Sequence, residues 1–117
     1  SRRTPINIKD MIKQKASKKN LFFPQKQINP YWCLLNISEY IFVTSDSISM
    51  LSDALSSGKK VYIVPIKKIK TKIKNFTKII LKKKMAKLFN GKLENWKYKK
   101  LSETNQVCKK LIKFLNL

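Results

Sequence analysis

Two short apolar runs with a helical pattern between them mark the middle of the chain. Residues 40–44 (Tyr-Ile-Phe-Val-Thr) and 61–64 (Val-Tyr-Ile-Val) are rich in β-branched and aromatic side chains, which is typical of buried strands. Apolar residues recur at helical spacing over 51–55, and Gly58 stands where that helix would end. Because two strands joined by a helix form a β-α-β unit, the pattern predicts an α/β domain with parallel strands.

The flanking segments carry simpler signals. Thr-Pro at 4–5 and Asn-Pro at 29–30 each pair an N-cap residue with Pro, so they predict a helix to about Lys18 and a short second helix. The apolar run 21–23 is a candidate strand, and 89–101 lacks periodicity and is expected to be a loop. Ser102 and Glu103 then cap a final helix, whose apolar residues we expect to face the core: Val107, Leu111, Ile112 and Leu115.

Residues 66–84 form a lysine-rich segment with a helical apolar stripe. The stripe consists of Ile69, Ile73, Phe76 and Ile80, with lysines around the rest of the helix. One interpretation is a solvated amphipathic helix packed on the sheet. The other is a helix that lies on a membrane surface.

The charge balance is extreme, with 27 Lys+Arg against 6 Asp+Glu and a net charge of +21. An anionic partner such as nucleic acid, an acidic membrane or a phosphorylated ligand would explain it. An AT-rich coding sequence would also explain it, because Lys, Ile and Asn are abundant while the chain has two Arg, two Gly and no His. No uncharged apolar run approaches the roughly 18 residues that span a bilayer.

Several kinds of chemistry are excluded within this chain. Without His, it cannot hold a Ser-His-Asp triad or a His-metal site. Cys33 and Cys108 lie far apart without metal-ligand spacing, so we expect two buried free thiols and no metal site.

The best candidate site is the turn 44–50 between the first strand and its helix. Unsatisfied backbone N–H groups and the positive end of the macrodipole favour an anion at a helix start. The turn also follows a parallel strand, where open α/β sheets bind ligands. Three serines could donate hydroxyl groups to a phosphate: Ser45, Ser47 and Ser49. The alternative is simple capping, in which Asp46 or Ser47 satisfies the first N–H groups and nothing else binds.

Three further residues are candidates for the same site. Asp53 lies farther along the helix, where a carboxylate could accept hydrogen bonds from ribose hydroxyls. Arg2 and Arg3 should follow another strand, and their planar guanidinium groups suit phosphate. They are the chain's two arginines; if compositional drift converts arginines to lysines, these two resisted it, which favours a geometric need.

Short motifs follow one another along nearly the whole chain. They are Ser-Arg-Arg-Thr-Pro at 1–5, Asn-Pro-Tyr at 29–31, Val-Thr-Ser-Asp-Ser-Ile-Ser-Met at 43–50, Ser-Asp-Ala at 52–54, Gly-Lys at 58–59 with Val-Tyr at 61–62, and the spaced set Phe89, Gly91, Leu93, Trp96, Tyr98, Leu101, Glu103 and Thr104. Their order resembles the bacterial relatives of the plant mitochondrial-fission ("elongated mitochondria") family, in the C-terminal half of that family.

The resemblance implies a two-lobed fold similar to GT-B glycosyltransferases, with residues 1–117 as one α/β domain, the Rossmann-like C-terminal lobe. Such a lobe holds a nucleoside-diphosphate sugar, with the phosphates at 44–50 and the ribose at Asp53, where the family usually has Glu. No cofactor is expected to be bound tightly. The acceptor site and catalytic base would belong to an N-terminal lobe, so no catalytic residue is assigned in this chain.

Two other functions stay open. The same fold could serve as a non-catalytic adaptor that recruits proteins, as the plant members of the family do. The charge could also make the chain a nonspecific binder of polyanions or of an acidic membrane, without a specific nucleic-acid partner. We expect the protein to be cytoplasmic, or peripheral to the inner face of a membrane.

Overall fold

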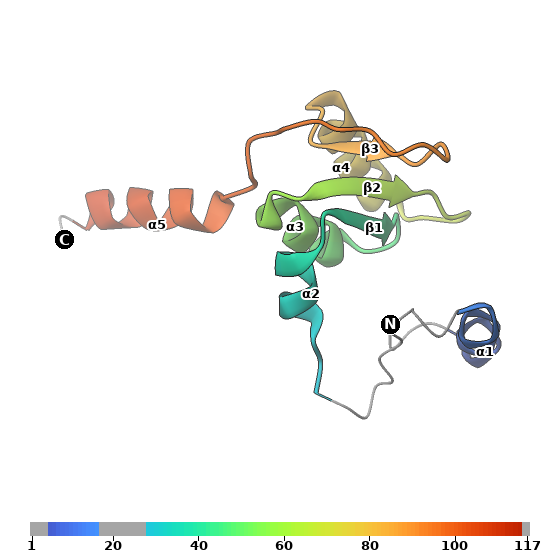
Figure 1. The fold of residues 1–117 in the computed structure, drawn as a ribbon. Coiled ribbons are helices and arrows are strands. Elements are labelled where there is room, and N and C mark those ends of the chain that lie inside the picture. The colour runs from blue at the N-terminus through green and yellow to red at the C-terminus, as the bar shows by residue number, and fades with distance from the viewer. Residues whose placement is uncertain (1–4, 17–27, 116–117) are drawn as a thin grey trace. The chain divides into compact units, whose positions relative to one another are not determined.

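The computed structural model describes residues 5–16 and 28–115 (Figure 1). The chain divides into two compact units, Ser1–Leu34 and Leu35–Leu117. The predictions for Arg2, Arg3 and the run at 21–23 lie outside the described residues.

The first unit contains the predicted N-terminal helix, α1 (Ile6–Lys15). Pro5, predicted to be the first helical residue, is the N-cap instead, so the helix begins one residue later than expected. It also ends earlier than expected, because Ala16 is already extended with φ −68° and ψ 126°. None of its residues is buried. Helix α2 (Tyr31–Ile37) spans the division between the units, and the Tyr31 N–H donates to Asn29 Oδ1 at 3.1 Å, which confirms the predicted helix start.

A three-stranded parallel sheet forms the second unit (Figure 1). Its strands are β1 (Tyr40–Thr44), β2 (Lys60–Val64) and β3 (Ala86–Leu88), in that order across the sheet. Tyr40 pairs with Lys60, and Val61 pairs with Ala86. The two predicted strands and their parallel pairing are confirmed, whereas β3 was not predicted.

Helices α3 (Ile48–Ser57) and α4 (Thr71–Lys82) bury apolar side chains against one face of this sheet. The core on that face consists of Val43, Leu51, Ala54, Leu55, Val61, Ile63, Ile80 and Ala86. Helix α3 ends at Gly58, whose φ of 75° is a left-handed conformation that glycine adopts without strain. Both the predicted inward face of α3 and its predicted end are therefore confirmed.

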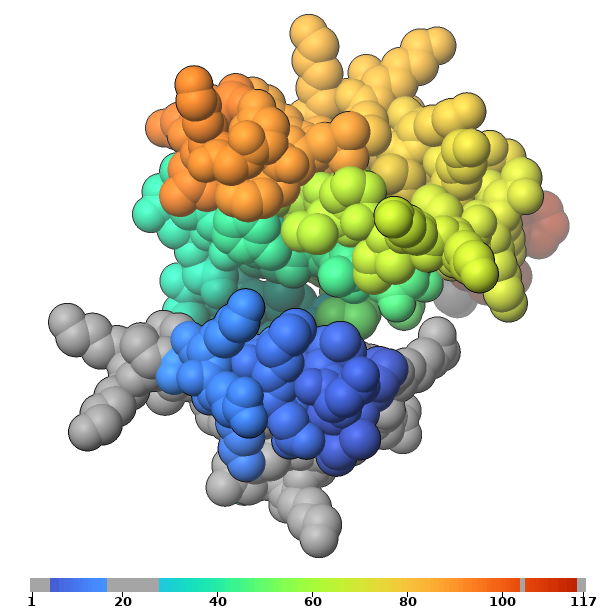
Figure 2. All heavy atoms as spheres, turned by 90° about the vertical axis from the view of Figure 1, so that its right-hand side faces the viewer, coloured from blue at the N-terminus to red at the C-terminus, as the bar shows by residue number. Residues whose placement is uncertain are grey.

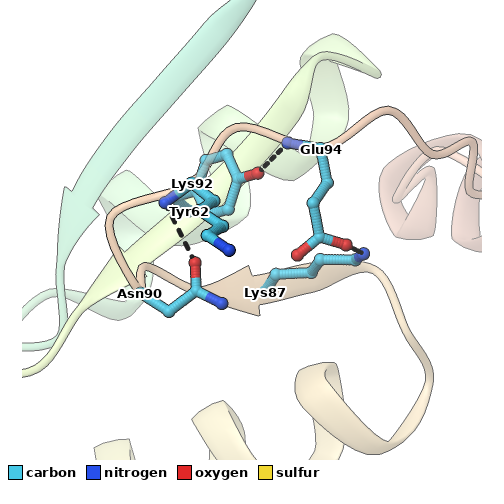
Figure 3. Close-up of polar contacts among 5 residues, drawn as sticks. All are labelled: Tyr62, Lys87, Asn90, Lys92 and Glu94. Carbon is cyan, nitrogen blue, oxygen red and sulfur yellow. Dashed lines mark hydrogen bonds and ion pairs between the residues drawn. The ribbon is translucent and has the colours of Figure 1, made fainter.

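The opposite face of the sheet carries a cluster of aromatic side chains. Tyr62 is fully buried, and its ring centroid lies 5.4 Å from that of Phe42, 5.5 Å from Phe89 and 5.2 Å from Trp96. The Tyr62 hydroxyl accepts a hydrogen bond from the Glu94 N–H at 2.6 Å, and Glu94 forms an ion pair with Lys87 (Figure 3). The loop after β3 is thereby fastened over this face.

Strand β1 is less buried than predicted. Within it only Val43 is buried, and Phe42 is 48% exposed. Successive side chains of a strand point to opposite faces. Phe42 therefore stands on the aromatic face, where the described residues place a loop rather than a helix over the sheet.

Two helices differ from their predicted form. The segment 66–84 becomes helical only from Thr71, because Lys68 before it adopts a left-handed φ of 65°. Helix α5 (Glu103–Phe114) has the predicted position, but its apolar residues were wrongly expected to face the core. Val107, Leu111, Ile112 and Leu115 are all exposed, since nothing among the described residues covers them. None of the described helices is long and apolar enough to cross a membrane.

Candidate functional site

The turn between β1 and α3 is built by hydrogen bonds among its own side chains. Thr44 Oγ1 donates to Asp46 Oδ1 at 2.7 Å, directly after the strand ends. Ser47 is the N-cap of α3, and its Oγ accepts from the Met50 N–H at 3.4 Å. The Ser47 and Ser49 hydroxyl oxygens lie 3.1 Å apart. Ser47 rather than Asp46 is therefore the cap, and the helix start faces solvent with Ser49 exposed beside it.

Ser45 differs from the other two serines of the turn because it is buried. It is 3% exposed, its N–H donates to the Val64 carbonyl at 3.0 Å, and its Oγ accepts from the Ile66 N–H at 2.9 Å. Ser45 thus ties the end of β1 to the end of β2. Of the three serines predicted to meet a phosphate, the structure places Ser47 and Ser49 nearer the surface and Ser45 inside.

Asp53 lines a cavity of about 440 Å³ on the outer side of α3. The other lining residues are Ser52, Ser56, Lys100, Leu101, Ser102, Glu103 and Asn105. The serines of the turn do not line this cavity. However, Ser49 and Asp53 are four residues apart on α3, so their side chains share one face of the helix. A polar stripe therefore leads from the helix start to the cavity.

A second cavity, of about 550 Å³, lies near the amino ends of β1 and β2 and was not predicted. Its lining includes Glu39, Lys59, Lys60, Trp96 and Tyr98. Lys60 Nζ forms an ion pair with Glu39 at 3.1 Å and lies 4.8 Å from the centroid of the Tyr40 ring. The lysine pair and the two aromatics were visible in the sequence, but no local pattern shows that the 95–98 segment returns to this edge.

Tyr98 closes the C-terminal end of α3. Its hydroxyl lies within donating distance of two carbonyl oxygens, that of Leu55 at 3.1 Å and that of Lys59 at 2.8 Å. Burial raises the pKa of Tyr98 to about 12. The last carbonyl groups of a helix have no hydrogen-bond donor within the helix, so they need donors from elsewhere. Tyr98 therefore has a structural role at this position.

Replacing Tyr98 by Phe should lower the free energy of unfolding at neutral pH by about 1 kcal/mol, because the ring stays and the donor is lost. Because the folded state holds the Tyr98 proton more tightly than the unfolded state, this group contributes its full stability below pH 10, the ordinary tyrosine pKa. That contribution is lost as the pH rises towards about 12. The difference between wild type and variant should therefore shrink over this window in urea denaturation experiments. A difference that stays constant to pH 12 would contradict the raised pKa of Tyr98 and the burial that causes it.

The two cysteines do not have the predicted burial. Cys33 and Cys108 are free thiols, and both are exposed. Cys33 lies on the exposed side of α2 and Cys108 on α5, where the expected packing against a core is missing from the described part of the chain.

The parallel sheet, the helices that flank it and the capped helix start after β1 define a Rossmann-like α/β protein. The family model described as mitochondrial fission ELM1 matches residues 1–115, so the chain belongs to that family. This confirms the family that the motif order indicated.

Two relatives support this membership. The chain is 39% identical over 122 residues to the protein RP120 of Rickettsia prowazekii (strain Madrid E), covering 97% of this chain and 34% of that protein. It is 34% identical over 86 residues to the mitochondrial fission protein ELM1 of Arabidopsis thaliana, covering 71% of this chain and 20% of that protein. The chain thus spans about a third or less of the length of these relatives. No solved structure matches it.

Proposed function

We propose that this chain is the nucleotide-sugar-binding lobe of a glycosyltransferase-like member of the mitochondrial fission ELM1 family. The observation that carries the proposal is the solvent-facing start of α3 at the carboxyl end of β1, with Ser47 and Ser49 beside it. The first N–H groups of a helix and the positive end of its dipole favour a diphosphate at such a place. Arg2 and Arg3 are proposed to add cationic contacts from the segment before α1.

The ribose would lie farther along the same helix. Asp53 follows the N-cap by six residues, which is a rise of roughly 9 Å and shorter than an extended nucleoside diphosphate. It shares a helix face with Ser49 and lines the 440 Å³ cavity, so a ligand held at the turn could reach its carboxylate. Thr44 Oγ1 donates to the Asp46 carboxylate and holds it in the turn, but the negative charge remains and would oppose a phosphate bound there.

Catalysis in such a protein would need both lobes. The residues of this lobe would bind and orient the donor and stabilise the departing diphosphate through N–H groups, hydroxyls and cations. The acceptor site and a catalytic base are proposed to lie in an N-terminal lobe. The matches cover only 34% and 20% of the two relatives, so both relatives are long enough to contain such a lobe.

A non-catalytic adaptor is the second candidate, and a specific observation favours it. Several polar groups of the turn already have partners within the chain: Thr44 Oγ1 donates to Asp46, the Met50 N–H to Ser47 and the Ile66 N–H to Ser45. These bonds need no ligand. On this view the α/β fold only displays a surface for recruiting other proteins.

Replacing Asp53 by Ala should weaken the binding of one nucleoside diphosphate or its sugar by about tenfold, because a charged acceptor for the ribose hydroxyls is lost. Thermal-shift titrations with the uridine, guanosine, adenosine and thymidine diphosphates and their common sugars would measure this. Asp10→Ala is the matched control, since it removes an exposed carboxylate from α1 and should leave the affinity unchanged.

Inorganic pyrophosphate separates charge from recognition in the same assay. A saturable shift for one nucleotide that pyrophosphate does not reproduce would support the donor-lobe function. Equal shifts for every polyanion, or an unchanged affinity of Asp53→Ala, would contradict the proposed ribose contact. No shift with any nucleotide would favour the adaptor.

A further inference from the structure

We propose that the outward side of α4 is a docking surface for a bilayer that contains acidic lipids. We define the α4 basic face as the four lysines Lys72, Lys74, Lys78 and Lys82, which are all exposed. This inference concerns a different surface from the α3 turn and does not depend on nucleotide binding.

The charge around α4 is concentrated and unopposed. Residues 67–84 contain nine lysines, and the sequence has no acidic residue between Asp53 and Glu94. The two ion pairs found among the described residues involve Lys60 and Lys87, so neither neutralises the α4 basic face. Figure 2 shows long side chains projecting into solvent from the yellow and gold surface that α4 and its neighbours form.

The structure determines how α4 could meet a bilayer. Ile80 and Thr77 are buried, and Phe76 and Leu81 pack against the core, so the apolar stripe of the helix is already occupied. Insertion of that stripe into lipid would require the core to open. The basic face remains available, and lysine clusters of this kind are attracted by the negative potential of a leaflet with acidic headgroups.

One exposed apolar residue favours a bilayer over a nucleic acid as the partner. Ile79 is 53% exposed on the lysine side of α4, where it could enter the headgroup region while the lysine stems extend around it. Proteins bind single-stranded nucleic acid by stacking its bases on aromatic side chains. For contacts with phosphates and bases they prefer arginine, whose planar guanidinium group binds with two hydrogen bonds. The α4 basic face contains neither, and Phe76 of α4 packs against the core.

Vesicle co-sedimentation of the full chain tests the proposal. We expect binding to phosphatidylcholine vesicles that carry about 30 mol% phosphatidylserine, and little binding to phosphatidylcholine alone. The binding should fall steeply between about 0.1 M and about 0.5 M salt, because the contact is electrostatic. Replacing Lys72, Lys74, Lys78 and Lys82 together by Gln should weaken it by about tenfold or more, and Ile79→Ser should weaken it by a smaller factor.

The matched control removes the same charge elsewhere, at the exposed lysines Lys99, Lys109, Lys110 and Lys113. Retained binding by this control, with both variants folded by circular dichroism, would support the α4 basic face. Equal losses in the two variants would show that only net charge is sensed and would overturn the proposal. Tighter binding to a random DNA duplex than to the acidic vesicles, lost with the same four α4 lysines, would overturn it in favour of nucleic acid.

Discussion

Replacing Tyr62 by Ala is expected to lower the free energy of unfolding by about 3–5 kcal/mol, the range for deleting a buried aromatic ring. Tyr62 is fully buried in the middle of the middle strand. Its ring is in contact with rings on both sides, including Phe42 and Trp96, and these would face a cavity after the substitution. Equilibrium urea denaturation would measure the loss, which is a large part of the roughly 5–15 kcal/mol that stabilises a domain.

Tyr62→Phe separates the ring from its hydroxyl. The ring contacts stay, but the Glu94 N–H loses its acceptor and the loop over the aromatic face loses one attachment (Figure 3). We expect a cost of about 1 kcal/mol. A Phe variant as unstable as the Ala variant would show that the hydroxyl, and not the stacked rings, holds this face together.

The parts of the fold that could be predicted are those that local pattern determines. β1, α3 and β2 each combine a regular hydrophobic period with a clear end signal, such as Gly58 after α3. Parallel pairing follows because a helical connection returns the chain in the same direction. The start of α2 could be found for the same reason, since Asn29 Oδ1 accepts from the N–H of a residue only two positions away.

The parts that could not be predicted depend on contacts between distant segments. β3 has three residues, one of them Lys87, and becomes a strand only by pairing with β2. Tyr98 reaches carbonyl groups more than thirty-five residues away, and no local period indicates such a bond. For α5, periodicity correctly gave an amphipathic helix, but it cannot show whether another element covers the apolar side.

The candidate site shows the same division. The strand, the turn and the helix start could be placed from the sequence, because capping is local. The different environments of Ser45 and Ser49 could not be predicted. Ser45 is held inside the fold, where its hydroxyl accepts from the Ile66 N–H, and Ile66 comes only after the next strand. Likewise, the cavity beside Asp53 is formed partly by residues around Ser102, far along the chain. Sequence therefore identified the polar residues, and the tertiary structure separates the surface hydroxyls from the structural one.

Replacing Leu55 by Ala should lower the free energy of unfolding by about 3–4 kcal/mol, within the range for a buried leucine. Leu55 is fully buried on α3 and belongs to the core between the helices and the sheet. Its backbone carbonyl also accepts from the Tyr98 hydroxyl, a bond that the substitution leaves in place. The loss measured in urea should therefore come from the cavity and the lost apolar contacts alone.

Leu111→Ala provides the matched control, because it makes the same chemical change at a residue of α5 that is 52% exposed. With half of the side chain already in water, its cost should stay within about 1 kcal/mol, and Ala favours the helix slightly. If Leu111→Ala destabilises the chain as much as Leu55→Ala, the apolar side of α5 is buried in solution. That result would contradict the exposed α5 and would require another surface to cover Leu111.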